Sequence, residues 1–242
     1  MTFAPNPARS LGPERQKGPQ QRMVNRGTTA AIVFLAVVLG VGCGDWRGPG
    51  FRARGPEMPR LRHELTLAPG MSVADVGAGR GEMTVAIAAE IGPTGHVYAT
   101  DIDPEALEQI RARVAAAALQ NVTILQARAR DSGLPTSCCD AVVLRRVYHH
   151  LSDPAATNFD LLRALRPGGV LAIIDFPPMF SWLWPWSPKD TLGRTGHGVA
   201  AGLVVAEVTA RGFTLVKVIE DWPGRGPLKS YCAIFRKPGA SP

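Results

Sequence analysis

The sequence predicts an α/β protein built on a doubly wound sheet with helices on both faces, and three observations indicate this fold class. From about residue 60 onward, short apolar runs alternate with amphipathic runs, as in chains whose strands and helices take turns. A cluster of glycines follows the first apolar run, where sheets of this kind bind their ligands. The composition of the 242 residues, 45% apolar and 19% charged, is that of a globular protein.

Individual elements follow from apolar periodicity and from helix caps. Asp103 with Pro104, and Asp153 with Pro154, are typical of helix starts, because the carboxylate accepts a backbone N–H and proline tolerates the first helical position. The predicted helices span residues 81–91, 103–121, 153–166 and 198–211. The predicted strands span residues 71–77, 96–103, 122–127, 140–147, 170–176, 213–219 and 230–235.

The N-terminal part of the chain differs from the rest. Residues 1–26 are rich in Pro, Arg and Gln and lack apolar periodicity, so we expect a disordered basic segment. Residues 27–44 carry no charge and follow Arg26, which is typical of a secretory signal or a membrane anchor, the alternative being a buried core helix. The remaining boundaries are expected at a linker over 45–60, a folded domain over 61–238 and a tail over 239–242.

A cysteine ends this uncharged segment. The residues LGVGC, which end at Cys43, resemble a bacterial lipobox, in which a small residue precedes a lipidated cysteine. The match departs from that pattern at Gly40, where a lipobox has leucine or another branched residue. Translation from Met23 would give a compact signal with Arg26 as its basic region. We therefore expect a protein anchored at a membrane or exported to a bacterial cell envelope, or a cytoplasmic one if this segment is not functional.

Charge and cysteine content argue against several kinds of site. Residues 1–62 carry 10 of the 27 Lys and Arg but 3 of the 20 Asp and Glu, so the rest of the chain is electrically neutral. A neutral domain does not favour a nucleic-acid-binding surface. The four cysteines include no CxxC pair, and the adjacent Cys138 and Cys139 make a poor disulfide and an incomplete zinc site. The sequence therefore predicts neither a disulfide framework nor a metal centre.

The stretch VADVGAGRGEMT is the strongest indication of a binding site. Gly77, Gly79 and Gly81 let a ligand approach the backbone, and the helix that follows directs its N–H groups toward that ligand. A dinucleotide-binding turn needs a third glycine where Glu82 stands, which disfavours an NAD-dependent oxidoreductase. Asp75 would repel a pyrophosphate and attract an ammonium group, so we expect a cationic ligand.

A second acidic residue indicates that this ligand contains a ribose. Asp101 ends the second predicted strand about 20 residues after Gly79, the spacing at which a carboxylate binds a ribose diol in nucleotide-binding βαβ units. With the motifs VYATDIDPEAL, CDAVVLRRVYHHL and LRPGGVLAIIDF in the same order, the glycine turn resembles the class I S-adenosylmethionine-dependent methyltransferases over residues 70–176. The resemblance implies a Rossmann-like sheet of seven strands whose last strand is antiparallel, with S-adenosylmethionine as cofactor.

The resemblance also implies roles for individual residues. Ile102 would lie against the adenine, and Asp101 would bind the ribose hydroxyls. The resemblance places four residues near the methionine part of the cofactor, namely Asp75, Gly77, Gly79 and Gly81. Each of these residues also has a structural interpretation when taken singly, namely a tight turn for a glycine, a helix cap for Asp101 and core packing for Ile102.

One position departs from the family pattern. Members of this family commonly carry an acidic residue after the third strand that accepts the adenine amino group, and Arg128 stands there. Arginine accepts no hydrogen bond, so Asp131 or a backbone carbonyl must substitute, or cofactor binding is weakened.

Candidates for proton transfer follow the fourth predicted strand. His149 or His150, in VYHHL, is positioned to act as a general base, the alternative being that one of them caps the loop and the other is solvated. Tyr148 is expected to pack against the cofactor, and His197 either approaches the substrate or lies exposed in a loop. No motif identifies the acceptor, which we expect to be a small molecule, and the oligomeric state is not indicated.

Two further features leave alternatives open. Arg145 and Arg146 end an apolar strand and either reach an acidic group in the cleft or turn to solvent. The segment FPPMFSWLWPWSP, residues 176–188, is expected to be a lid over an apolar acceptor, a membrane-touching element or a local aromatic cluster. A competing interpretation of the whole chain is a degenerate cofactor-fold, lipoprotein-like binding module without catalysis.

Overall fold

The computed structural model describes residues 57–178, 198–223 and 230–239, all within the unit Phe51–Pro242. The predictions for the basic segment, the uncharged segment and the lipobox lie outside the described residues, as do those for His197 and for residues 179–188 of the aromatic segment. None of the helices within the described ranges is long and apolar enough to cross a membrane.

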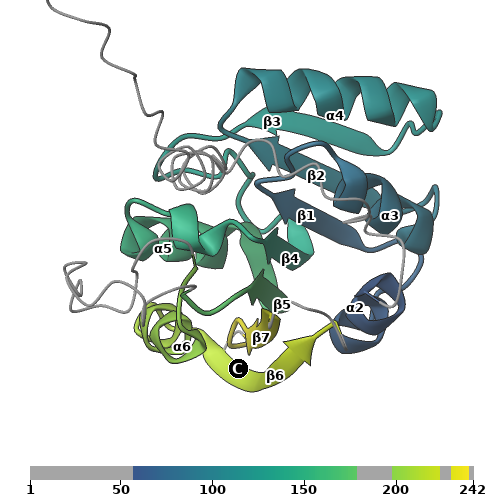
Figure 1. Ribbon diagram of the computed structural model, residues 1–242. Coiled ribbons are helices and arrows are strands. Elements are labelled where there is room, and N and C mark those ends of the chain that lie inside the picture. The colour runs from purple at the N-terminus through teal and green to yellow at the C-terminus, as the bar shows by residue number, and fades with distance from the viewer. Residues whose placement is uncertain (1–56, 179–197, 224–229, 240–242) are drawn as a thin grey trace, which may run out of the picture. The chain divides into compact units, whose positions relative to one another are not determined.

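The fold is a seven-stranded sheet with the strand order β3-β2-β1-β4-β5-β7-β6 (Figure 1). β7 pairs antiparallel with β5 and with β6, and all the other neighbouring strands are parallel. This arrangement confirms the predicted Rossmann-like fold with an antiparallel last strand. The strands are β1 Ser72–Val76, β2 His96–Asp101, β3 Val122–Gln126, β4 Cys139–Arg145, β5 Leu165–Asp175, β6 Thr214–Trp222 and β7 Ser230–Arg236.

Helices cover both faces of this sheet, as predicted. Alternate side chains of a strand point to opposite faces, so Val142 and Leu144 of β4 pack in the core formed with α5 and α6, whereas Ala141 and Val143 pack in the core formed with α2 and α3. α4 packs over β2 through Leu107 and other apolar residues. The helices are α2 Glu57–Leu65, α3 Glu82–Ile91, α4 Pro104–Ala116, α5 Pro154–Ala164 and α6 Ala201–Thr209, and the 3-10 turn η1 is Tyr148–His150.

The two predicted helix caps are confirmed. The Asp103 carboxylate accepts the N–H of Glu105 at 2.9 Å, and the Asp153 carboxylate accepts the N–H of Ala156 at 3.0 Å. α4 ends earlier than the predicted residue 121, because Ala118 adopts a left-handed conformation with φ 52°, which terminates a helix. The hydrogen bonds of the Asp103 and Asp153 carboxylates satisfy N–H groups that the first turn of a helix leaves without partners.

The start of α2 and the start of β5 also differ from the predicted boundaries. Helix α2 begins at Glu57, inside the expected linker, where Met58, Leu61 and Leu65 form a short apolar stripe that packs against α3 and the sheet. Strand β5 begins at Leu165, because that residue pairs with Cys139 and the register then shifts to Ala141↔Val170. Both differences arise from tertiary contacts that a short segment does not reveal by its own periodicity.

The interpretation of the adjacent cysteines needs a correction. Cys138 and Cys139 form a disulfide at the start of β4, although the sequence argued against one. Both side chains are buried in the core cluster that also contains Leu161 and Ala164 of α5. Cys232 is a buried free thiol, and burial raises its pKa well above the usual range.

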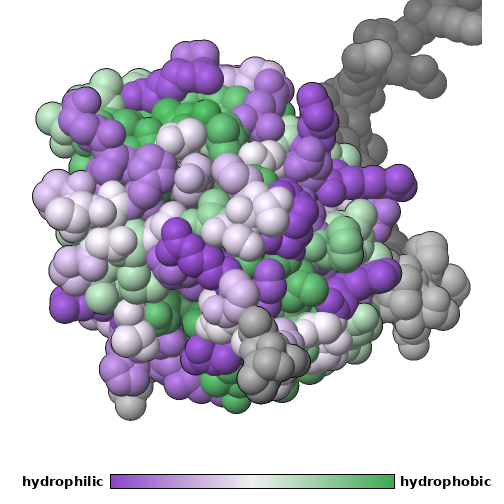
Figure 2. All heavy atoms as spheres, turned by 180° about the vertical axis from the view of Figure 1, so that it is seen from behind, coloured by the Kyte–Doolittle hydropathy of each residue, from purple (hydrophilic) through white to green (hydrophobic). Residues whose placement is uncertain are grey.

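Hydrophilic and hydrophobic residues are interspersed over the face shown in Figure 2.

Candidate functional site

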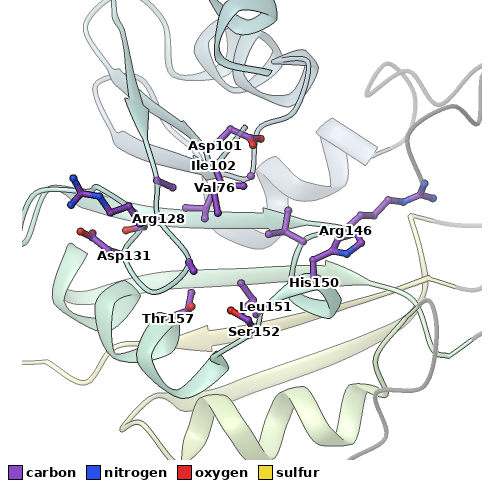
Figure 3. A pocket seen from close by; sticks show the side chains of 15 residues that line it. Val76, Asp101, Ile102, Arg128, Asp131, Arg146, His150, Leu151, Ser152 and Thr157 are labelled. Carbon is purple, nitrogen blue, oxygen red and sulfur yellow. The ribbon is translucent and has the colours of Figure 1, made fainter. Parts of the chain in front are cut away.

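A cavity of about 400 Å³ opens beyond the carboxyl ends of β1, β2 and β4 (Figure 3). This is where the strand order reverses, and its size lies within the range of small-molecule sites. Gly77, Asp101, Ile102, Asp131 and His150 were predicted as site residues and line the cavity. Its other walls come from Val76, Ala127, Arg128, Ala129, Ser132, Arg146, Val147, Leu151, Ser152 and Thr157.

The glycine turn follows β1 with three left-handed glycines. Gly77 has φ 70°, and a Cβ atom there would lie 2.4 Å from a methyl group of Val147. Gly79 has φ 54° and open space where a Cβ atom would be, so a ligand can approach its backbone. A Cβ atom on Gly81 would come 3.3 Å from the Cα of Ile110, so this glycine allows α3 and α4 to pack closely.

Asp101 joins this turn to the cavity wall. Its Oδ2 accepts the N–H of Gly79 at 2.8 Å, and its Oδ1 accepts the N–H of Asp103 at 3.0 Å. A carboxylate has about four lone-pair positions, so two backbone bonds leave it able to accept the hydroxyls of a ribose. Ile102 is 59% exposed and lies beside Asp101 on the same wall, which suits a flat apolar ring. These features fit the ribose and adenine of S-adenosylmethionine.

Asp75 lies behind the turn and not on the cavity wall. It is buried, its Oδ2 accepts the hydroxyl of Thr84 at 2.6 Å, and burial raises its pKa to about 6. Thr84 belongs to α3, so this bond connects β1 to the helix that follows the glycine turn. Of the predicted cofactor residues, Asp75, Gly79 and Gly81 lie outside the cavity lining.

The loop after β3 forms the opposite wall. Arg128 and Asp131 exchange two backbone hydrogen bonds, and the Asp131 carboxylate accepts the N–H of Gly133. The backbone N–H of Ser132 donates to Asp160 of α5 at 2.8 Å, and its hydroxyl contacts the same carboxylate oxygen. Ser132 was missed at the sequence level, because its partner lies 28 residues away on another element.

The two histidines occupy different environments within η1. His150 is exposed and lines the cavity, whereas the side chain of His149 is only 4% exposed. His149 Nδ1 lies 2.8 Å from Oδ1 of Asp175, the last residue of β5. Asp175 was not predicted as a site residue, although an aspartate that ends an apolar strand was a usable signal.

Tyr148 does not pack against the cofactor site. It is buried in the core, its hydroxyl donates to Glu207 of α6 at 2.9 Å, and the Asn158 amide donates to that hydroxyl at 2.8 Å. The expectation for Tyr148 was therefore wrong, because the residue belongs to a hydrogen-bonded group between η1, α5 and α6.

The structure separates the roles of the two arginines. Arg145 reaches a carboxylate, since its Nε lies 3.0 Å from Glu57 of α2, outside the cavity lining. Arg146 lines the cavity, adopts a left-handed φ of 59°, and holds its guanidinium carbon 5.8 Å from the Phe176 ring centre. Burial is the main cause of the lowered pKa of Arg146.

Comparisons with known proteins agree with this geometry. Residues 74–173 match the family described as "Methyltransferase domain". A solved S-adenosylmethionine-dependent methyltransferase from Aquifex aeolicus superposes with a TM-score of 0.61 at 23% identity, covering 74% of this chain and 88% of that one. The comparisons support a class I S-adenosylmethionine-dependent methyltransferase. They also support S-adenosylmethionine as the cofactor expected from the sequence.

Two curated relatives act on different acceptors, by their names. A demethylmenaquinone methyltransferase of Listeria monocytogenes serotype 4a is 33% identical over 111 residues, covering 46% of this chain and 47% of that protein. An arsenite methyltransferase of Halobacterium salinarum is 31% identical over 162 residues, covering 67% of this chain and 38% of that protein. The chain thus spans less than half the length of these relatives.

Proposed function

We propose that this protein transfers a methyl group from S-adenosylmethionine to a small-molecule acceptor. The observation that carries the proposal is the cavity in which Gly77, Asp101 and Ile102 meet, within a segment that matches a methyltransferase domain. The cofactor supplies an electrophilic methyl group on a sulfonium. The protein must bind it, align an acceptor and exclude water.

Each part of the cavity has a proposed task in that binding. The Asp101 carboxylate accepts the ribose hydroxyls while Gly79 holds it in place, and Ile102 covers the adenine. Gly79 leaves room for the methionine part beside the backbone. Asp131 is proposed to receive the adenine amino group in place of the acidic residue that Arg128 replaces.

The acceptor is proposed to be apolar. Much of the cavity lining is apolar, which favours an acceptor with a hydrophobic body. The apolar lining residues include Val76, Ala127, Val147 and Leu151. The names of the relatives offer a quinone-type acceptor, as in demethylmenaquinone methyltransferase, and an inorganic one, as in arsenite methyltransferase. The aromatic segment 176–188 remains a proposed lid or membrane contact.

Cofactor titration of the Asp101→Ala variant tests the proposal. We expect wild-type protein to bind S-adenosylmethionine, and the variant to lose about 1 to 3 kcal/mol of binding free energy, because a charged acceptor is removed from two hydroxyls. Isothermal titration calorimetry measures the difference, with Glu220→Gln on an exposed part of β6 as the control. Equal affinity in Asp101→Ala and wild type contradicts the assignment.

A further inference from the structure

A buried carboxylate–imidazole pair adjoins His150, which lines the cavity, and it has no part in the cofactor binding proposed above. Asp175 ends β5 and its side chain is completely buried, while the His149 side chain is 4% exposed. His149 Nδ1 lies 2.8 Å from Oδ1 and 3.1 Å from Oδ2 of Asp175. A buried polar pair of this kind is costly to form and has a defined geometry.

Backbone groups hold the carboxylate in one orientation. Oδ2 of Asp175 accepts the N–H of His149 at 3.1 Å, and Oδ1 accepts the N–H of Phe176 at 2.9 Å. Because a carboxylate only accepts hydrogen bonds, Nδ1 of His149 carries the hydrogen. When the imidazole is neutral, its lone pair is then on Nε2, which is the arrangement that a general base requires.

The pair is connected to the glycine turn through η1. Val147, which precedes η1, occupies the space that a Cβ atom on Gly77 would need, and β4 lies directly beside β1. The His149 ring centre lies 3.9 Å from that of His150, which lines the cavity, and 4.9 Å from that of Phe176. An aromatic acceptor could stack against such a group of rings.

Two other titratable side chains adjoin the pair. His150 comes from the same turn, and Arg146, at the end of β4, interacts with the charge of Asp175 and lies over Phe176. Both line the cavity, so they are placed to contact the acceptor or the cofactor. Asp175 is the carboxylate that contacts the His149 ring.

We propose that Asp175 and His149 form a general-base pair and that the acceptor is an uncharged phenol-type hydroxyl. This inference rests on the proposed methyltransferase function. The acceptor O–H bond breaks as its proton moves to Nε2 of His149, and the oxygen electron pair forms the new bond to the methyl carbon. The carbon–sulfur bond breaks at the same time, its electrons stay on sulfur, and S-adenosylhomocysteine is released. Asp175 is a positioning residue that stabilises the imidazolium.

The pair distinguishes between acceptor classes. A hydroxyl is a weak nucleophile until its proton is removed, so it gains from a positioned base. Arsenite attacks through a lone pair that is already available, as does a thiolate, and neither needs a proton acceptor. In an Asp175→Asn variant the amide can donate to Nδ1, which moves the ring hydrogen to Nε2 and removes the base while conserving shape.

Activity on two matched acceptors tests the proposal with the full-length protein. The probes are catechol, whose hydroxyl is uncharged at about pH 7.5, and 4-nitrocatechol, which is ionised there. We expect kcat for catechol to fall roughly 100-fold in Asp175→Asn, kcat for 4-nitrocatechol to fall less than about threefold, and the Kd for S-adenosylmethionine to stay within about twofold. His149→Gln should behave the same way, and it replaces Asp175→Asn if that variant does not fold.

Each alternative result has a defined meaning. Equal losses for the two catechols would show a structural pair and overturn the inference. The inference is also overturned if the protein binds the cofactor and methylates arsenite in the presence of glutathione, but methylates no member of a panel of phenols, catechols and hydroquinones. Cofactor binding without transfer to any of these probes overturns it as well. Failure of the wild-type protein to bind S-adenosylmethionine instead contradicts the proposed function itself.

Discussion

At the scale of single residues, Asp75 combines a charge with complete burial. Its pKa is raised to about 6 because the carboxylate is removed from water, and the hydrogen bond from Thr84 only partly offsets this. A carboxylate with a raised pKa contributes stability below its unfolded pKa, and that contribution is lost as the pH rises through the folded pKa. Asp75 therefore costs stability at neutral pH.

An Asp75→Asn variant tests this cost. Relative to the variant, wild-type protein is expected to lose on the order of 3 kcal/mol of unfolding free energy as the pH rises from about 4 to about 7. Urea denaturation across that range measures the difference between the two proteins. As the control, Glu220→Gln on an exposed part of β6 should show the same dependence of unfolding free energy on pH as wild type. The same dependence in Asp75→Asn and wild type would contradict the raised pKa of Asp75.

At the scale of elements, α2 is held to the sheet by a buried ion pair. Glu57 accepts bonds from Arg145 of β4 at 3.0 Å and from the Trp222 indole of β6 at 3.1 Å. The helix also packs Met58 and Leu61 into the core shared with α3. Its first residue thus connects two strands that are not neighbours in the sheet.

Removal of one partner of a buried pair is more harmful than removal of both. We expect Glu57→Ala to lower the unfolding free energy by about 3 kcal/mol, and Glu57→Ala combined with Arg145→Leu to recover part of that loss. Chemical denaturation of the two single variants and the double variant gives the coupling energy. Additive effects would mean that the pair adds little to the docking of α2.

At the scale of the whole molecule, the N-terminal segment and the folded domain point to different places in the cell. The uncharged residues 27–44 are expected to act at a membrane, whereas S-adenosylmethionine is made in the cytosol. A lipidated Cys43 would reconcile the two only if the domain keeps access to the cofactor. Localisation therefore remains a prediction that bears on which acceptor the protein meets.

Fractionation of cells that express the full chain tests this expectation. We expect the protein in the membrane fraction, and we expect Cys43→Ser to release it if lipidation is the anchor, because a serine cannot carry the thioether-linked lipid. Retention of Cys43→Ser in the membrane fraction would indicate a transmembrane anchor instead. Full-length protein found wholly in the cytosolic fraction contradicts both.

The sequence by itself determined the local parts of this protein. The alternation of apolar and amphipathic runs, the caps Asp103 and Asp153, and the glycine turn with Asp101 all act over a few residues or between consecutive elements, so periodicity and spacing reveal them. They were sufficient to predict the doubly wound sheet and, through the family resemblance, its antiparallel last strand and its cofactor.

Only the tertiary structure decided which residues meet across the fold. Asp175 contacts His149 across 26 residues, and Glu57 contacts Arg145 across 88, so no local pattern predicts either pair. The same reason explains why Tyr148 faces the core and why Asp75 stays off the cavity wall. Burial and hydrogen bonding depend on how distant segments pack, because each buried polar group takes its partner from whichever element is adjacent in space.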